Sequence, residues 1–264
     1  GHQEDSGEPQ STISSTRYLK RKINLGITRL WPFSGGQERI EHPIFAQNHS
    51  WFKDIDQNQP LECFNFVVFD TELTGLSSKD EIVSIGAVHV RDLKIVAGET
   101  FYSLVRPHKI FDATDSTLLH RLTPEELAKA PTLKDILPKF IEFCGPSLLV
   151  GHYVSLDVRF INQAAKKIFR STIKNPCMDT MRLAQVYTET CWENYHDQFN
   201  LQVSFNLADL SNAYGLPPFS QHDALQDSLQ TAYLFIYLAK KLKGQGLVTL
   251  KDLFNAGQSW KRIF

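Results

Sequence analysis

The sequence has few of the features that mark secreted, disulfide-stabilised or membrane proteins. Its 264 residues include only four cysteines, with no Cys-x-x-Cys spacing among them. This usage favours reduced thiols over a disulfide framework or a zinc site. No apolar run approaches the ~20 residues that span a bilayer, and no signal peptide is evident. We therefore expect no membrane span and a cytoplasmic location.

The chain also has almost no net charge. Its 28 Lys and Arg residues nearly balance 29 Asp and Glu residues, which gives a formal charge of −1. The chain therefore lacks the excess of positive charge that would indicate a high-affinity, non-specific nucleic-acid binder. An enzyme that acts on nucleic acid is still compatible with this charge, because bound cations would neutralise phosphates locally. The 42% of hydrophobic residues are enough for a sizeable core.

What the sequence does have is acidic residues in apolar surroundings. An apolar run of strand type, residues 66–69, ends at Asp70, and Glu72 follows two residues later. Alternate residues of a strand share a face, so these carboxylates would project side by side if the strand continues to residue 72. Like charges held close repel each other, and a hard cation such as Mg²⁺ relieves that repulsion. The pair predicts a cation site, although an aspartate at a strand end is also a common turn residue.

A second acid, Asp157, lies on the apolar stripe of a helix predicted over residues 156–169. Phe160, Ile161 and Ala164 belong to the same stripe, at the 3.6-residue period. An acid on the buried face of a helix needs a partner. The alternative is that Asp157 caps the helix start.

A third acidic segment opens a long apolar-rich helix over residues 223–243. Asp227 would lie in its early turns, and His222 just before it, free to face a site. Asp223 competes with Asp227 as the functional acid, but Asp223 is better placed as an N-cap or first-turn acid. Taken alone, a histidine such as His222 is more often a surface or hydrogen-bonded residue than a general base.

In this order the three segments resemble the DEDDh branch of the DnaQ-like 3′–5′ exonucleases. The resemblance covers residues 62 to 243 and retains all five chemical positions. It departs from the family pattern, His-Asn-x-x-Phe-Asp, in the second motif. The first motif is Asp70-x-Glu72, with Leu73 in place of a common Thr. The second is His152-x4-Asp157, with Tyr153 for Asn and Leu156 for Phe. The third is His222-x4-Asp227.

The resemblance implies hydrolysis of phosphodiester bonds at nucleic-acid 3′ ends, with release of nucleoside 5′-monophosphates. It implies two divalent cations, Mg²⁺ or Mn²⁺, about 3.5–4 Å apart. Asp70 would bridge them, Glu72 and Asp227 would complete the metal that carries the attacking water, and Asp157 would hold the second. His222 would be the general base, since an imidazole pKa of roughly 6.5 suits proton abstraction near neutral pH.

The resemblance also implies a substrate-binding group at the first two motifs. In relatives the leucine at the position of Leu76 packs against the terminal bases, whereas ordinary core packing is the alternative. Asp179 is expected to be structural, as a cap on the following helix. His120 is similar to a substrate-side residue of the family, but residues 123–126 are first of all a capped helix start. The full substrate-binding set is Thr71, Leu73, Thr74, Leu76, His152 and Tyr153.

The expected fold is α/β, a ribonuclease H-like mixed five-stranded sheet flanked by helices, with a helical N-terminal extension. The first strand is central, and the next two form an antiparallel meander. The strands are predicted at 64–70, 81–91, 94–106, 148–153 and near Cys177. The helices are predicted at 115–121, 124–129, 132–144, 156–169, 179–190, 206–214 and 223–243.

Three regions are expected along the chain. Residues 1–16 form a disordered tail that starts with a tag remnant, residues 17–60 a basic amphipathic extension and linker, and residues 61–264 the exonuclease domain. The stretch 17–30, with five basic residues and no acid, would contact nucleic acid, an anionic membrane surface or a partner, or pack with a solvated face. Residues 37–61 form a linker or a helical cover anchored by Trp51 and Phe52.

The expected substrate is a single-stranded or frayed 3′ end, with DNA favoured over RNA, and the expected protein partner is a polymerase or a second copy of the chain. Two other functions are open. Residues 70–74 superficially resemble the Asp-x-Asp-x-Thr start of haloacid-dehalogenase phosphatases, although Glu72 stands where those enzymes need a second Asp. The chain would alternatively be a catalytically degenerate exonuclease-fold module that binds nucleic acid or a polymerase.

Overall fold

The structure is a computed structural model that describes residues 42–108, 122–193, 204–220 and 222–259. The chain separates into two units, Gly1–Glu38 and Arg39–Phe264, and every described residue belongs to the second. The predicted features of residues 1–41, including the basic stretch 17–30, lie outside the described residues, as do the predicted helix at 115–121 and His120.

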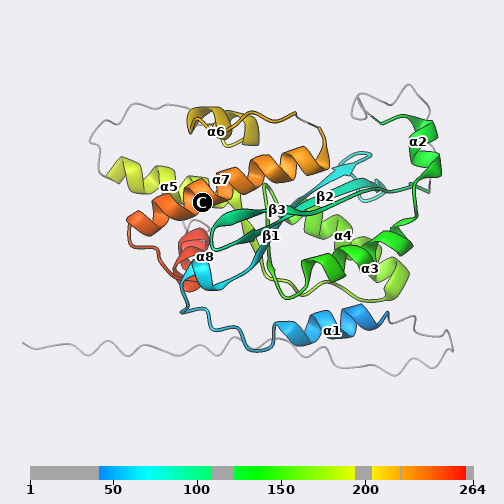
Figure 1. Cartoon of the computed structure of the whole chain (residues 1–264), viewed down its shortest axis with the longest axis horizontal. Helices are drawn as coiled ribbons and strands as arrows, with labels where there is room; N and C mark the ends of the chain where they lie inside the picture. The colour runs from blue at the N-terminus through cyan, green and yellow to red at the C-terminus, as the bar shows by residue number, and fades with distance from the viewer. Residues whose placement is uncertain (1–41, 109–121, 194–203, 221, 260–264) are drawn as a thin grey trace, which may run out of the picture. The chain divides into compact units, whose positions relative to one another are not determined.

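A five-stranded mixed sheet forms the centre of the described unit (Figure 1). Its spatial order is β3-β2-β1-β4-β5. The first two pairings, β1 with β2 and β2 with β3, are antiparallel, whereas β4 is parallel to both β1 and β5. The strands are β1 (Phe66–Leu73), β2 (Ile82–Arg91), β3 (Lys94–Leu104), β4 (Leu148–Gly151) and β5 (Cys177–Asp179).

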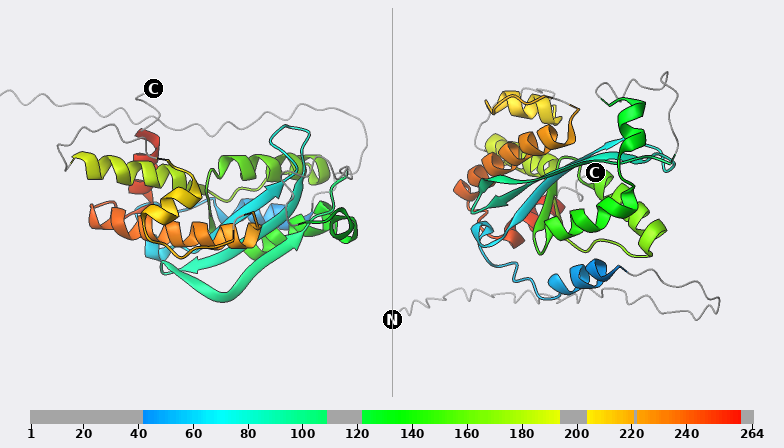
Figure 2. Two further views of the ribbon diagram at one scale, coloured as in Figure 1. Left: turned by 90° about the horizontal axis from the view of Figure 1, so that it is seen from above. Right: turned by 45° about the vertical axis from the view of Figure 1, so that its right-hand side comes forward.

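The apolar run at residues 66–69 is a strand because both of its faces are covered. All four residues are buried, with alternate side chains in separate cores. Phe66 and Val68 pack in the core that includes α7 (Ala224–Gly244), and Val67 and Phe69 pack in the core that includes α3 (Leu133–Cys144) and α4 (Ser155–Phe169). Figures 1 and 2 show these helices on opposite sides of the sheet.

The remaining helices surround these two layers. A short 3₁₀ turn, Leu61–Cys63, precedes β1. Helix α2 begins with the predicted cap: Thr123 and Glu126 form a reciprocal capping box, and Pro124 is the first helical residue. The helices are α1 (Pro43–Trp51), α2 (Pro124–Lys129), α5 (Thr180–Glu193), α6 (Leu207–Ala213) and α8 (Leu250–Ser259). None of the described helices is long and apolar enough to cross a membrane.

The predicted fold class is confirmed, with corrections at the edges. Strand β1 does not end at Asp70 but runs three residues further, to Leu73. The segment 37–61 contains a helix, α1, whose fully buried residues are Phe45 and Asn48; the predicted anchors Trp51 and Phe52 are half-buried, and Trp51 packs against the core that includes α3 and α4. Phe45 packs on Phe169 of α4, with the ring centroids 5.1 Å apart. Helix α8 was not predicted.

Candidate active site

Asp70 and Glu72 lie in the C-terminal half of the central strand, β1. Asp70 is paired with Gly86 and Glu72 with Ser84 in the antiparallel register of β1 and β2. Because both residues lie within the strand and two positions apart, they share one face of the sheet. The alternative of a turn residue at Asp70 is therefore wrong.

Asp227 reaches the same place from the first turn of α7. One carboxylate oxygen from each of Asp70, Glu72 and Asp227 lies within 4.8 Å of the other two. All three residues are half-buried. Three oxygen ligands this close suit a hard divalent cation such as Mg²⁺ or Mn²⁺, and repel one another without it. The donor set therefore fits the cation that the motifs imply.

Gly86 allows the start of α7 to lie directly on the sheet. A Cβ atom at Gly86 would be 2.2 Å from the backbone carbon of Ala224, the first residue of α7. Asp223 caps this helix start, and its side chain accepts hydrogen bonds from Leu225 and Gln226 at 3.0 Å. Asp223 is thus an N-cap, as predicted, which leaves Asp227 as the acid of the third motif that joins the cluster.

Asp157 joins the site through Thr71, the residue between Asp70 and Glu72. Its Oδ1 accepts the Thr71 backbone N–H at 3.1 Å and the Thr71 hydroxyl at 2.5 Å. Helix α4 begins at Ser155, so Asp157 is in its first turn and its carboxylate points to the sheet. The N-cap alternative for Asp157 is wrong, and the predicted need for a buried partner is met by Thr71.

Burial, with added repulsion from neighbouring acids, raises the pKa of every carboxyl in the cluster. Burial, followed by the charges of Asp157, Asp227 and Glu72, raises the pKa of Asp70 well above its ordinary value. Burial raises the pKa of Asp157 to about 7, against the hydrogen bonds from Thr71. The pKa values of Glu72 and Asp227 are also raised, mainly by burial. Without a cation, the site therefore disfavours its own ionised form.

His222 stands at the edge of this cluster in a left-handed backbone conformation, with φ of 63°. Its backbone N–H donates to Asp227 Oδ2 at 3.1 Å. The residue is exposed, and its charge counteracts the rise in the pKa of Glu72. The imidazole thus lies near the carboxylates while it stays open to solvent.

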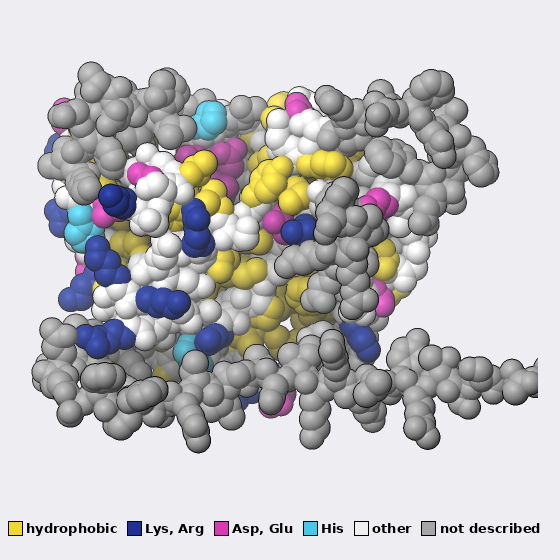
Figure 3. Space-filling model, turned by 180° about the vertical axis from the view of Figure 1, so that it is seen from behind, with side chains coloured by type: hydrophobic (Ala, Val, Ile, Leu, Met, Phe, Trp, Pro, Cys, Tyr) yellow, Lys and Arg dark blue, Asp and Glu magenta, His cyan; other side chains and the backbone are white. Residues whose placement is uncertain are grey.

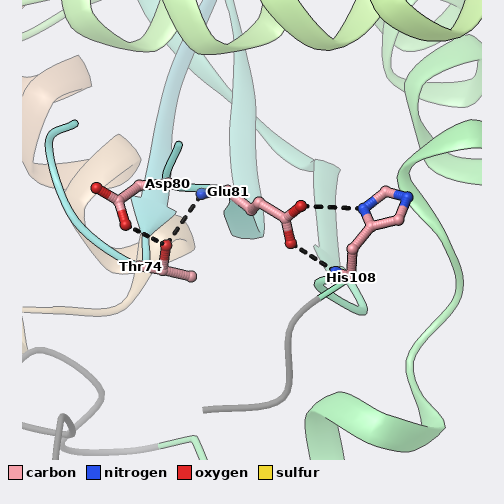
Figure 4. Close-up of polar contacts among 4 residues, drawn as sticks. All are labelled: Thr74, Asp80, Glu81 and His108. Atoms are coloured by element: carbon pink, nitrogen blue, oxygen red, sulfur yellow. Dashed lines mark hydrogen bonds and ion pairs between the residues drawn. The ribbon is translucent and has the colours of Figure 1, made fainter. Parts of the chain in front are cut away.

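The end of β1 and the loop after it carry three predicted substrate-side residues: Leu73 is the last residue of the strand, and Thr74 and Leu76 lie in the loop. Thr74 Oγ1 donates to Asp80 Oδ1 and accepts the Glu81 backbone N–H, both at 3.0 Å (Figure 4). Leu73 is half-buried against the α3–α4 core. Leu76 is 69% exposed, so the alternative of core packing is wrong for it.

The second motif supplies one enclosed and one open side chain. His152 Nε2 contacts the Phe205 carbonyl at 2.9 Å, and its Nδ1 contacts Thr180 Oγ1 at 2.8 Å. Burial lowers its pKa to about 4, so the ring is neutral at pH 7. Tyr153, with φ of 56°, is 45% exposed. Its backbone N–H donates to Asp179 Oδ1, which also accepts from Met181 N at 3.0 Å, and this confirms the structural role predicted for Asp179.

Sequence reasoning missed two residues near the site, besides Gly86. Tyr102 on β3 is paired with Gly86 and is 45% exposed. Its pKa is raised by burial and by the charges of Asp223, Glu126 and Glu72, which places the phenol near the acidic cluster. Arg159 on α4 donates from Nη2 to the Leu76 carbonyl at 3.0 Å. A glycine inside an apolar strand was a usable signal, whereas Tyr102 and Arg159 carry none without the strand register and the fold.

The fold and the carboxylate cluster together are those of a domain of the exonuclease class. The family model described as Exonuclease, of the RNase T type, matches residues 67–235. The chain belongs to this exonuclease family, which confirms the resemblance drawn from its three motifs and places it among the nucleases.

Curated relatives are DNA polymerase III proteins. The chain is 34% identical over 194 residues to a DNA polymerase III subunit epsilon-like protein of Rhodobacter capsulatus, covering 72% of this chain and 26% of that protein. It is 37% identical over 179 residues to the PolC-type DNA polymerase III of Clostridium perfringens, covering 67% of this chain and 11% of that protein. The chain thus spans only a small part of these relatives.

Solved structures share the fold at lower sequence identity. Exonuclease X in complex with 5′ overhanging duplex DNA superposes with a TM-score of 0.52 and 24% identity, covering 73% of this chain and 99% of that one. Escherichia coli Exonuclease I with a dA16 oligonucleotide gives 0.55 and 17%, covering 67% and 41%. The nuclease domain of 3′hExo, a DEDDh family member bound to rAMP, gives 0.50 and 17%, covering 67% and 92%.

Proposed function

We propose that this protein is a metal-dependent 3′–5′ exonuclease that releases nucleoside 5′-monophosphates from nucleic-acid 3′ ends. The observation that carries the proposal is the meeting of Asp70, Glu72 and Asp227, whose ligand oxygens lie within 4.8 Å of one another. Membership of the exonuclease family supports the class of reaction. The direction of cleavage, the dependence on metal, the number of cations and the substrate all belong to the proposal.

Asp70, Glu72, Asp157 and Asp227 would hold two divalent cations, Mg²⁺ or Mn²⁺. Asp70 would be shared, since the charges of Asp157, Asp227 and Glu72 all act on it and, after burial, raise its pKa. Both hydrogen bonds from Thr71 go to Asp157 Oδ1, and the proposal assigns Oδ2 to the second cation or to its water. Such a pair of cations, when bound, stabilises the attacking and leaving oxygens of a displacement at phosphorus.

His222 would be the general base that takes the proton of the attacking water. Two observations support this role: the residue is exposed at the edge of the carboxylates, and its backbone is fixed by the bond to Asp227. Histidine is the side chain that most often serves as a general base in such a transfer. The neighbouring acids would stabilise the imidazolium that forms.

The substrate side would be formed by the first two motifs. Leu76 and Tyr153, at 69% and 45% exposure, present apolar surface that the terminal bases would cover. Stacking of this kind is tolerant of sequence. Thr71, Leu73, Thr74 and His152 would shape that surface through the contacts that hold them in place.

DNA is the proposed substrate, because the curated relatives are DNA polymerase III proteins and two of the similar structures contain DNA. A single-stranded or frayed 3′ end would suit Leu76 and Tyr153, because its unpaired bases are free to cover these exposed side chains. By the same relatives, a polymerase is the proposed partner, with a second copy of the chain as the other choice, and the cytoplasm is the proposed location. We also propose that the exonuclease domain begins at residue 61, after an extension over residues 17–60.

Matched DNA and RNA oligonucleotides with a 3′ label, incubated with Mg²⁺ or Mn²⁺, test the proposal. We expect mononucleotides to leave the labelled end first, faster from DNA, with no reaction in EDTA. Faster release from RNA would overturn the DNA assignment alone. Binding without any hydrolysis would instead favour the degenerate module, and phosphate release from a small phosphomonoester would favour the phosphatase alternative.

A further inference from the structure

The exposed side of α4 carries a row of basic side chains. Arg159, Lys166 and Lys167 are exposed and stand seven and eight residues apart, which places them on one side of the helix. Gln163 is exposed between them, and Arg170 caps the helix end. The one acid of this helix, Asp157, is buried and bonded to Thr71. The outer side of α4 is therefore a cationic surface without an acid of its own.

A groove of about 440 Å³ runs beside this row. Its apolar lining includes Ile82, Val105 and Phe160. Lys167 of α4 lines it, together with residues 78–82 and 105–108, among them Lys79 and Arg106. Three cations from three segments thus line one hollow.

The acids of the groove are engaged within the protein, as Figure 4 shows. Asp80 accepts from the Thr74 hydroxyl at 3.0 Å and from Ser77 N at 2.7 Å. Glu81 accepts the backbone N–H of His108 at 2.5 Å and contacts its Nδ1 at 3.0 Å. In contrast, no ion pair among the residues that the structure describes involves Lys79, Arg106, Arg159, Lys166 or Lys167.

Arg159 connects this surface to the carboxylate site. Its Nη2 donates to the carbonyl of Leu76, an exposed apolar residue of the loop after β1. The guanidinium also lies over the Phe160 ring, 5.0 Å from its centroid. The basic row therefore begins beside the loop proposed to hold the terminal base and leads away from it along α4. Figure 3, from the side on which α4 lies, shows Lys and Arg side chains gathered on one part of that face.

We propose that α4 and this groove bind the phosphate backbone of the single DNA strand upstream of its 3′ end. The inference rests on the proposed function, since it takes the terminal nucleotide to lie at Asp70 and Leu76. From Arg159 to Lys167 the helix rises about 12 Å. That length is enough for the row to contact more than one phosphate of a strand. Nucleotides upstream of the terminal ones therefore bind the cations at the far end of the row.

The test compares the double variant Lys166→Gln/Lys167→Gln with a control of equal charge change, Lys240→Gln/Lys241→Gln. The control lysines are exposed at the other end of α7. The probes are fluorescent oligo-dT strands of 4 and 16 nucleotides. Their binding is measured by anisotropy in EDTA over a salt series, and their hydrolysis is measured separately with Mg²⁺.

We expect the α4 variant to bind the 16-mer about 10-fold more weakly than wild type at low salt, and the 4-mer equally well. The slope of log K against log salt should fall by about 1.4, which is about 0.7 for each lost phosphate contact on a single strand. In hydrolysis, KM for the 16-mer should rise while kcat stays unchanged. The α7 control should match wild type in each measurement.

Equal binding of the 16-mer by wild type and the α4 variant would overturn the inference, and so would equal losses in the α4 and α7 variants. A wild-type protein that fails to distinguish the two lengths would overturn it as well. The proposed function fails separately. In that case the length-dependent binding in EDTA persists, but no oligonucleotide is hydrolysed with Mg²⁺.

Discussion

Thr71 donates both its backbone N–H, at 3.1 Å, and its hydroxyl, at 2.5 Å, to one oxygen of Asp157, a residue 86 positions further along the chain. Thr71 stands between the two acids of the first motif, and Asp157 is the acid of the second. The two motifs are therefore joined directly, independently of any cation. This link fixes the position of the Asp157 carboxylate relative to Asp70 and Glu72.

Replacing Thr71 with valine keeps the shape of the side chain and removes the hydroxyl donor. The Asp157 carboxylate then has one bond fewer to hold it, so metal affinity and activity should fall by roughly 10- to 100-fold, as for other residues that orient a ligand. Calorimetric titration with Mn²⁺ measures the first and oligonucleotide trimming the second. Thr100→Val, at an exposed position of β3, is the matched control. Equal metal affinity in the two variants would contradict the orienting role of Thr71.

Replacing Gly86 with alanine should displace the start of α7. The added Cβ would be 2.2 Å from the backbone carbon of Ala224. Because this clash is with backbone, no movement of a side chain can relieve it. Since Asp227 and His222 stand at this helix start, we expect loss of trimming and weaker metal binding, together with a lower Tm. Gly244→Ala, whose added Cβ meets nothing within 4 Å, should retain activity. A Gly86→Ala protein with wild-type activity would show that the close approach of α7 to β2 does not position the third motif.

Replacing His222 with alanine should separate proton transfer from metal binding. A lost general base typically costs about 10²- to 10⁴-fold in rate, so kcat should fall by that order. The carboxylate ligands remain, so calorimetry should show metal affinity close to that of wild type. If metal affinity instead collapsed with the rate, His222 would be a ligand, and the proposed base would be wrong.

The order and type of the main elements followed from local patterns, whereas the residues of the cluster followed from three local motifs together with the family resemblance, which selects Asp227 over Asp223. The apolar run before Asp70 predicts a strand, and the Thr123–Glu126 box predicts a helix start that the structure confirms. The end of β1 was misplaced because Thr71, Glu72 and Leu73 have no apolar pattern. Their extended backbone comes from pairing with β2.

Other features depend on tertiary contacts that no local pattern specifies. The near-zero net charge conceals the basic side of α4, because the acids that balance it lie elsewhere or are bonded to neighbours. The two hydrogen bonds from Thr71 to Asp157 Oδ1 join segments 86 residues apart. The exposure of Leu76 depends on the loop that the hydrogen bond from Thr74 to Asp80 closes. Motif spacing predicts which acids meet, but not how they are held.

The stability of the metal-free protein should depend on pH through Asp157. Its pKa rises from an ordinary value of 3.8 to about 7 on folding, mainly through burial. The folded state therefore binds this proton more tightly than the unfolded chain, so the stability that Asp157 contributes is fully present below about pH 4 and is lost as pH rises through 7. Asp157→Asn removes this dependence and retains an acceptor for Thr71.

Thermal unfolding in EDTA measures this effect as the difference in Tm between Asp157→Asn and wild type. The variant should gain relative to wild type as the pH is raised from 5 to 8. His152, whose pKa is lowered to about 4 by burial, changes stability in the opposite direction below pH 6.5 but is common to both proteins. Added Mg²⁺ should raise the Tm of wild type more than that of the variant. A difference in Tm that does not change with pH would contradict the claim that burial of Asp157 makes its ionisation unfavourable in the metal-free protein.

The central claim is that Asp70, Glu72 and Asp227 hold the cation that hydrolysis requires, and Asp227→Asn tests it most directly. A single-stranded DNA labelled at its 3′ end is incubated with Mg²⁺ and either wild type or the variant, with matched Tm values as evidence of an intact fold. We predict that wild type releases the label as a nucleoside 5′-monophosphate and that the variant releases none above background. Trimming by the variant at a rate near that of wild type would contradict the account.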